Sequence, residues 1–141
     1  NLEINDKGTN CKWKKIIIAV DFDPDGIGHI ASLIIQLFYK WFPDIINKGK
    51  LFILSTPLVS TDTSKGVREY YYSLDDFSKS NAANKKNVRY LKGLGSLSVQ
   101  DWNYVFANMN LYRVIIDGNS ERSMNIAFGE SVLLRKKWLA K

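Results

Sequence analysis

The stretch KKIIIAVDFDPDGIGHI, residues 14–30, joins a short run of branched apolar residues to a group of acids. The run KKIIIAV is short, rich in β-branched side chains and bounded by charge, which predicts a buried strand. Asp21, Asp23 and Asp25 follow at alternate positions, and Gly26 comes directly after them at a predicted turn. The stretch therefore predicts a strand with three carboxylates at its carboxyl end.

A helix is predicted after this turn, because apolar residues recur at spacings of three and four, which places them on one helical face. They are Ile30, Leu33, Ile34, Leu37, Phe38, Trp41 and Ile45. Pro43 is expected to kink or restart the helix, and Gly49 is expected to end it.

Four more strands and several short helices are predicted downstream. The strands are LFILSTP (51–57), VREYYYS (67–73), VRYL (88–91) and LYRVIID (111–117). Capping-box spacings predict helices that begin after Ser73 and Ser98, and residues 120–141 predict two short helices around Gly129. Strands that alternate with helices favour an α/β fold, with a mostly parallel sheet flanked by helices and a helical tail at the C-terminus.

The composition of this 141-residue chain favours one domain with a basic surface. It is 45% hydrophobic, and Lys and Arg outnumber Asp and Glu by 20 to 14. The surplus of positive charge favours a polyanionic partner, although a basic domain without one fits equally well. No apolar run approaches the length of a membrane span and the single cysteine, Cys11, cannot form an internal disulfide, so we expect a soluble cytoplasmic protein. Residues 1–12 are polar and are expected to be irregular, before a domain at 13–141.

The alternating acids suggest a metal site. Residues i and i+2 of an extended backbone project to the same side, so Asp21 and Asp23 are expected to lie together. Two carboxylates this close repel one another unless a cation intervenes, and a hard ion such as Mg²⁺ fits them. We interpret Asp21 and Asp23 as metal ligands and Asp25 as a supporting acid or a helix cap. A purely structural interpretation also exists, because Asp, Pro and Gly all favour turns.

Three kinds of functional site begin with such a pattern. A calcium EF-hand is excluded, because its twelfth position requires a bidentate Glu and Ser32 stands there, and because the upstream run predicts a strand. A haloacid-dehalogenase phosphotransferase has a strand ending in D-x-D, with the first Asp as nucleophile, and VDFD resembles it. A Mg²⁺ site for phosphoryl transfer on nucleic acid is the third kind. The local residues leave the last two open.

A second motif, RYLKGLGS at residues 89–96, follows about sixty residues later. It is not a Walker A loop, because Lys92 precedes the glycines. Gly93 and Gly95 would let the backbone approach a phosphate closely, and Lys92 would add a positive charge. The same residues also fit a plain strand-to-helix turn with a solvated lysine.

Together, the two stretches resemble the Toprim domain of type IIA DNA topoisomerases, the gyrase B and topoisomerase II family. In that family a strand ends in D-x-D-x-D-G and a later turn carries K-G-L-G. The helix between them, with an aromatic end and a proline, is matched by residues 37–54, and a later Arg-rich helix by FGESVLLRKKWLAK (128–141). The resemblance covers residues 13–141 in order and implies a Toprim-like Rossmannoid fold.

Three details are most similar to the small Toprim subunit of T4-like bacteriophages, whose gyrase-B-like subunit is split into two chains. They are the extra residue in DGIGHI (25–30), the form RYxKGLGSL (89–97) and the ending LRKKW (134–138). The family's E-G-D-S-A motif, whose Glu also binds the metal, is absent from this sequence. The resemblance therefore implies an incomplete Toprim domain, whose first acidic motif lies on another polypeptide or has been cut away.

The resemblance also implies roles for individual residues. Asp21 and Asp23 would be catalytic and bind Mg²⁺ at the scissile phosphate, with Asp25 in support. DNA contacts are implied for His29, Lys92, Gly93, Gly95 and Arg135.

The implied holoenzyme is an ATP-dependent type IIA topoisomerase that cuts and reseals double-stranded DNA. One partner subunit would carry the ATPase, bind ATP and supply the missing Glu, and another would carry the catalytic tyrosine. A two-fold hetero-oligomer is expected, with no membrane contact and, for a viral chain, in the host cytoplasm. Two alternatives stay open: a phosphohydrolase that uses Asp21 as nucleophile, and a non-catalytic DNA-binding module.

Overall fold

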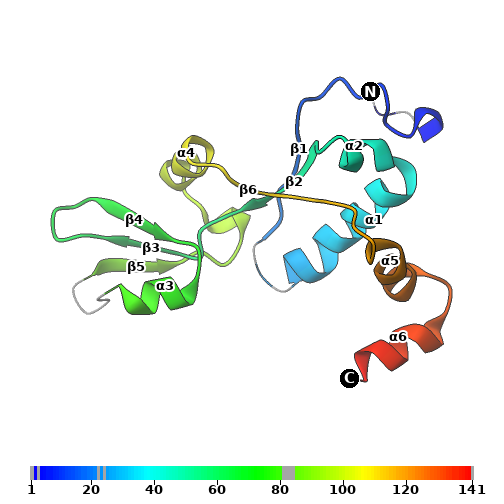
Figure 1. Cartoon of the computed structure of the whole chain (residues 1–141). Helices are drawn as coiled ribbons and strands as arrows, with labels where there is room; N and C mark the ends of the chain where they lie inside the picture. The colour runs from blue at the N-terminus through cyan, green and yellow to red at the C-terminus, as the bar shows by residue number, and fades with distance from the viewer. Residues whose placement is uncertain (1, 3, 22, 24, 81–84, 141) are drawn as a thin grey trace. The chain divides into compact units, whose positions relative to one another are not determined.

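The computed structural model of the chain describes residues 2, 4–21, 23, 25–80 and 85–140 (Figure 1). It divides into two units, each described by itself. Unit 1 comprises Asn1–Ile16, Leu33–Leu51 and Arg113–Lys141, and unit 2 comprises Ile17–Ser32 and Phe52–Tyr112.

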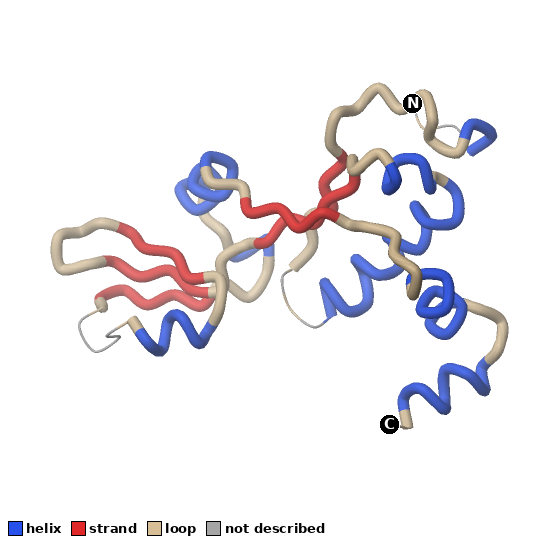
Figure 2. The backbone as a smooth tube through the Cα atoms, viewed as in Figure 1, coloured by secondary structure: helices blue, strands red, loops and turns tan. Residues whose placement is uncertain are grey.

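Unit 2 contains a three-stranded antiparallel sheet in the order β4-β3-β5 (Figure 2). The strands are β3 (Val59–Asp62), β4 (Arg68–Tyr71) and β5 (Lys86–Tyr90). Ser60 lies opposite both Tyr70 and Arg89, so these three side chains share one face of the sheet.

Two helices pack on opposite faces of this sheet. Phe77 of α3 (Leu74–Lys79) lies against the rings of Tyr71 and Tyr90, with centroids 5.4 and 6.3 Å away. On the other face, Tyr70 stacks on Tyr104 of α4 (Val99–Ala107) at 4.0 Å. Both helices begin where their capping signals predict, since Ser73 accepts a hydrogen bond from Asp76 and Ser98 forms a full capping box with Asp101.

A second sheet has the order β1-β2-β6, with β1 (Ile16–Ile18), β2 (Leu51–Ser55) and β6 (Asn110–Arg113). A core of buried side chains in unit 2 joins β2 to α4 and to the segment after β5. Its members are Leu54, Leu91, Leu97 and Val105, with Trp102 and Leu111 packed against them. Each such burial stabilises the fold by about 1.5–3 kcal/mol, which fixes the segment that carries the KGLG turn.

The expectation of one mostly parallel sheet is wrong for the β4-β3-β5 sheet, because β3 pairs antiparallel with both its neighbours. β3 itself was not predicted. Its sequence, VSTD, has little apolar character, yet Val59, Ser60 and Thr61 are all buried. The mixed α/β character is confirmed.

The helix after the acids begins with a π-helical turn, η2 (Gly26–Ala31), and continues as α1 (Ser32–Trp41). Pro43 starts a new helix, α2 (Pro43–Asn47), and Gly49 follows with a φ of +65°, as its predicted terminating role requires. The predicted apolar face is only partly buried, because Phe38 is enclosed whereas Leu33 and Trp41 are 48% and 42% exposed.

At the N-terminus, residues 4–6 form a single 3-10 turn, η1 (Ile4–Asp6), within the segment expected to be irregular. Gly8 then passes close to α2, where a side chain would clash with Ile45 at 2.7 Å.

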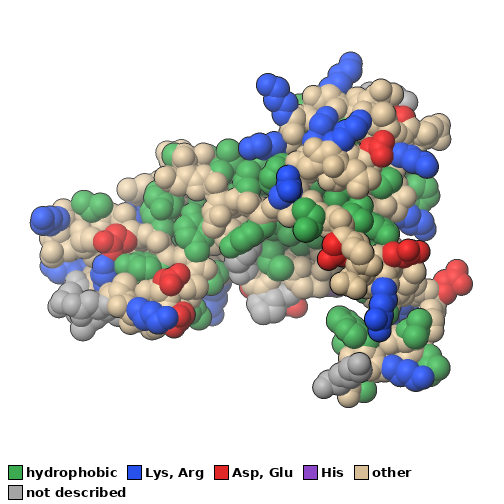
Figure 3. Space-filling model, viewed as in Figure 1, with side chains coloured by type: hydrophobic (Ala, Val, Ile, Leu, Met, Phe, Trp, Pro, Cys, Tyr) green, Lys and Arg blue, Asp and Glu red, His purple; other side chains and the backbone are tan. Residues whose placement is uncertain are grey.

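The two C-terminal helices, α5 (Ser120–Phe128) and α6 (Val132–Leu139), lie on either side of Gly129, as predicted. Hydrophobic side chains and Lys or Arg mix on the surface of this part of the chain (Figure 3). Within the described residues, no helix has the length and apolar character needed to cross a membrane.

Candidate active site

Asp21 lies just after β1 and contacts the second motif. Its Oδ1 accepts a hydrogen bond of 2.7 Å from the backbone N–H of Leu94, in the turn that follows Lys92. The two residues are 73 positions apart in the chain. The fold thus joins the acidic stretch and the KGLG turn into one site within unit 2.

Gly93 makes this approach possible. It has a φ of +153°, and a side chain there would lie 3.0 Å from Oδ2 of Asp21. Glycine is therefore needed both for its backbone conformation and for the space. Gly95, the other glycine of the motif, faces open space. In this structure the group close to Gly93 is the Asp21 carboxylate. The expected approach of this backbone to a phosphate stays a prediction.

Asp23 and Gly26 fix the turn after the strand. Oδ1 of Asp23 accepts a 2.7 Å hydrogen bond from the backbone N–H of Gly26. A side chain on Gly26 would come within 1.9 Å of the Asp21 carbonyl oxygen, so only glycine fits. Asp25 is exposed and makes no capping hydrogen bond. The capping role considered for Asp25 therefore belongs to Asp23.

Asp21 and Asp23 border the same hollow, of about 310 Å³, together with Lys92 and Gly93. Apolar side chains complete its lining: Leu58, Leu74, Tyr90 and Leu91. The two acids therefore reach a common space, as their alternation predicts.

The donor set fits a magnesium ion in part. A backbone N–H orients Oδ1 of each carboxylate, and Oδ2 of each has no hydrogen-bonding partner among the described residues. Carboxylates oriented in this way suit Mg²⁺, which takes one or two of them and keeps several waters. Within the described residues, no group of three or more His, Cys, Asp or Glu side chains is arranged to hold a metal ion. Asp25 thus does not complete a three-acid site in this arrangement.

The remaining predicted residues fall in different places. Lys92 is exposed at the hollow, and His29 is exposed on η2. Arg135 lies on α6 in unit 1, where its guanidinium donates a hydrogen bond to the carbonyl oxygen of Gly129. Arg135 thus has a local role at the start of α6.

A buried ionic cluster around Asp101 was not predicted from the sequence. This side chain is fully buried, and it accepts hydrogen bonds from Ser98, from the Tyr70 hydroxyl at 2.9 Å and from Arg89 at 3.2 Å. Arg68 lies 3.6 Å away. The capping-box spacing revealed Asp101 as a cap, but the cross-strand arrangement of Tyr70 and Arg89 depends on an antiparallel sheet that was not predicted.

The cluster alters the acidity of its members. Burial raises the pKa of the Asp101 carboxyl, but the hydrogen bonds from Ser98 and Tyr70 and the charge of Arg89 outweigh it, so the pKa lies below the ordinary 3.8. Burial, and then the hydrogen bond to Asp101, raise the pKa of Tyr70 to about 12. Asp101 is therefore ionised and Tyr70 protonated at neutral pH.

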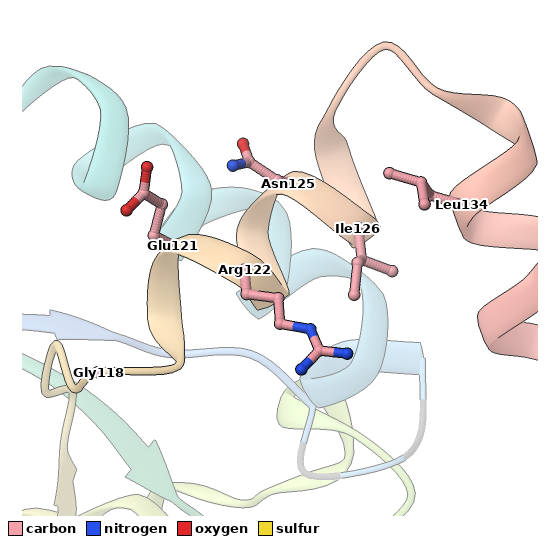
Figure 4. Close-up of a pocket in the computed structure, with 6 residues that line it drawn as sticks. All are labelled: Gly118, Glu121, Arg122, Asn125, Ile126 and Leu134. Atoms are coloured by element: carbon pink, nitrogen blue, oxygen red, sulfur yellow. The ribbon is translucent and has the colours of Figure 1, made fainter.

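A larger hollow, of about 450 Å³, lies at α5 and α6 in unit 1 (Figure 4). Leu134 of α6 points toward Ile126 of α5, and Arg122 extends from α5 nearby. Glu121 is the one carboxylate in its lining. This hollow lacks the paired acids of the other, so its chemistry does not favour a metal.

Comparison with known proteins identifies the family. Residues 54–141 match the family described as the C-terminal associated domain of Toprim. The chain belongs to this family. The match covers the second motif but begins after the acids, so it supports the fold around the KGLG turn most directly.

Two named relatives extend the similarity to the acidic stretch. The chain is 26% identical to the DNA topoisomerase small subunit of Enterobacteria phage T4, over 99% of this chain and 87% of that one. It is 30% identical to a DNA topoisomerase 4 subunit of Mycoplasma pneumoniae, over 99% of this chain but only 22% of the relative. The chain thus spans most of the phage protein and about a fifth of the bacterial one. The expected kinship with type II topoisomerases is confirmed.

A solved structure shares the fold. The Plasmodium falciparum topoisomerase II DNA-binding, cleavage and re-ligation domain superposes with a TM-score of 0.75 at 20% identity, over 98% of this chain and 19% of that one. The chain therefore shares the fold of that domain.

Proposed function

We propose that this chain is the Mg²⁺-binding Toprim part of an ATP-dependent type IIA DNA topoisomerase. The observation that carries the proposal is the hydrogen bond between Asp21 and the Leu94 N–H, which brings both motifs into one site. Relatives along nearly the whole chain are named DNA topoisomerases. They favour this function over an Asp21 phosphohydrolase.

Asp21 and Asp23 would hold the metal through their Oδ2 atoms, with Asp25 in a supporting position. Bound Mg²⁺ would neutralise charge on the scissile phosphate and on the 3′ oxygen that leaves and returns. The third acid would come from another polypeptide or a preceding segment, because the described residues supply no group of three.

Exposed residues in each of the two units would contact DNA. Lys92 is exposed beside Asp21, and the Gly93 and Gly95 backbone lies in the same turn. His29 is exposed on the turn after the acids. On α6, Arg135 and its exposed neighbours Lys136 and Lys137 would contact the phosphate backbone.

The nucleophile would come from a partner. The hydroxyl groups of two tyrosines are already engaged in hydrogen bonds within the fold: Tyr70 donates to Asp101 and Tyr71 donates to Glu69. We assign the attacking tyrosine and the ATPase to separate subunits of a two-fold hetero-oligomer, acting on double-stranded DNA in the cytoplasm.

Reconstitution tests the function. The purified chain alone is expected not to relax supercoiled DNA, whereas the chain mixed with the ATPase-bearing and tyrosine-bearing subunits is expected to relax it with ATP and Mg²⁺. The two partner subunits without this chain form the control and should be inactive. Relaxation by the chain alone, or by the partners without it, would refute the proposal.

A further inference from the structure

We propose that Asp101, acting through Arg89, is a positioning residue that aims the KGLG turn at Asp21. The inference rests on the proposed function, because it assigns a use to the turn beside the metal acids. All the residues involved belong to unit 2.

The first step is the burial of Asp101. Its carboxylate has no solvent exposure and lies at the N-terminus of α4, between that helix and the antiparallel sheet. The Ser98 N–H and hydroxyl donate to Oδ2 at 2.8 and 2.7 Å, and Arg89 Nη1 donates to the same atom at 3.2 Å. These donors confine the Asp101 carboxylate to one position, because moving it would break hydrogen bonds and leave a buried charge unpaired.

In the second step, Arg89 forms two hydrogen bonds through its guanidinium group. While Nη1 binds Asp101, Nη2 donates to the backbone carbonyl oxygen of Ser96 at 3.2 Å. One planar guanidinium thus connects the buried anion to the end of the turn. The fixed geometry of the two nitrogens transmits the position of Asp101 to Ser96.

The third step is the turn itself. The Ser96 N–H and hydroxyl donate to the carbonyl oxygen of Gly93 at 2.9 and 2.7 Å, which closes residues 93–96 into a small ring. The Leu94 N–H projects from this ring to Oδ1 of Asp21 at 2.7 Å. A shift of Ser96 therefore moves the donor that orients Asp21. Loss of such an outer partner of a metal ligand typically weakens metal affinity or activity 10- to 100-fold.

Two variants separate positioning from mere stabilisation. Arg89→Lys keeps the positive charge beside Asp101, but a single ammonium lacks the fork that joins Asp101 to Ser96. Tyr70→Phe is the matched control, because it also removes one hydrogen bond to Asp101 but leaves the Arg89 bonds to Asp101 and Ser96 in place. Urea unfolding of both variants measures their global stability.

The first readout is independent of metal: the hydrogen-exchange rate of the Leu94 amide in the full chain. The second is the Mg²⁺ concentration that gives half-maximal DNA cleavage by the reconstituted enzyme. Arg89→Lys is expected to raise both about tenfold, and Tyr70→Phe is expected to leave both near wild type at a comparable loss of stability.

The proposal is overturned if Arg89→Lys leaves Leu94 exchange and the Mg²⁺ requirement unchanged. It is also overturned if, in both variants, the Leu94 exchange rate and the Mg²⁺ requirement change only in proportion to the loss of global stability. A wild-type enzyme without Mg²⁺-dependent cleavage would refute the proposed function instead, and Leu94 exchange would still decide whether Arg89 positions the turn.

Discussion

At the scale of single residues, the site depends on the hydrogen bond from the Leu94 N–H to Asp21, which no local sequence pattern predicts. Alternation predicted that Asp21 and Asp23 reach a common space, and both border one hollow. The partner of Asp21 was not predictable, because Leu94 lies 73 residues away and donates through its backbone. Local sequence patterns predict contacts between neighbouring residues. The tertiary fold determines which distant backbone N–H donates to a given carboxylate.

Gly93→Ala is expected to destabilise the chain by about 1–3 kcal/mol, because the backbone at φ +153° excludes a side chain and the Cβ would press on Asp21. The free energy of unfolding in urea measures the effect. Gly95→Ala is the matched control, since nothing lies within 4 Å of its added Cβ. Equal stability of the two variants would show that Gly93 is not needed for the contact.

Lys92→Ala is expected to weaken DNA binding and to reduce the slope of log affinity against log salt by about 0.9, the effect of one lost phosphate contact. Titration of the reconstituted enzyme with DNA at several salt concentrations measures that slope. Lys65→Ala, which removes an exposed lysine that does not line the hollow, should leave it unchanged. An unaltered slope for Lys92→Ala would show that Lys92 is a solvated turn residue without a phosphate contact.

At the scale of elements, local signals predicted helices better than sheets. Capping boxes, Pro43 and Gly49 act on neighbouring residues, and the helices that they predict begin and end accordingly. Strand pairing depends on distant partners. Polar β3 lies between β4 and β5, and helices pack on both faces of that sheet, so neither the strand nor its antiparallel pairing could be inferred from its own sequence.

Asp101 joins α4 to this sheet, and its ionisation is expected to make the chain sensitive to acid. Because its pKa in the folded chain is below 3.8, its contribution to stability is complete above that pH and is lost as the pH falls further. Asp101→Asn should therefore be less stable than wild type at pH 7, by about 3 kcal/mol, and the difference should shrink below pH 4.

Urea unfolding of wild type and Asp101→Asn at pH 7 and pH 3 measures this difference. Asp75→Asn, at an exposed acid on α3, is the control and should change little at either pH. A difference that stays constant with pH would mean that the charge of Asp101 does not stabilise the fold.

At the scale of the whole molecule, the chain matches most of one relative and a small part of another. It corresponds to 87% of the phage relative and to only 22% of the Mycoplasma one. Several large apolar side chains of α1 and α6, such as Leu33, Leu133 and Trp138, are at least 48% exposed. The family could be inferred from two short motifs in order. The acid that would complete the proposed metal site is not found among the described residues.

The most direct measurement is Mg²⁺-dependent DNA cleavage by the reconstituted enzyme with Asp21→Ala or Asp23→Ala. Both variants are expected to fold, as circular dichroism would show, and to lose cleavage, because each removes a carboxylate that faces the proposed metal. Asp75→Ala, which removes an exposed acid that does not line the hollow, should cleave as wild type does. Normal cleavage by both Asp21→Ala and Asp23→Ala at the wild-type Mg²⁺ concentration would contradict the account.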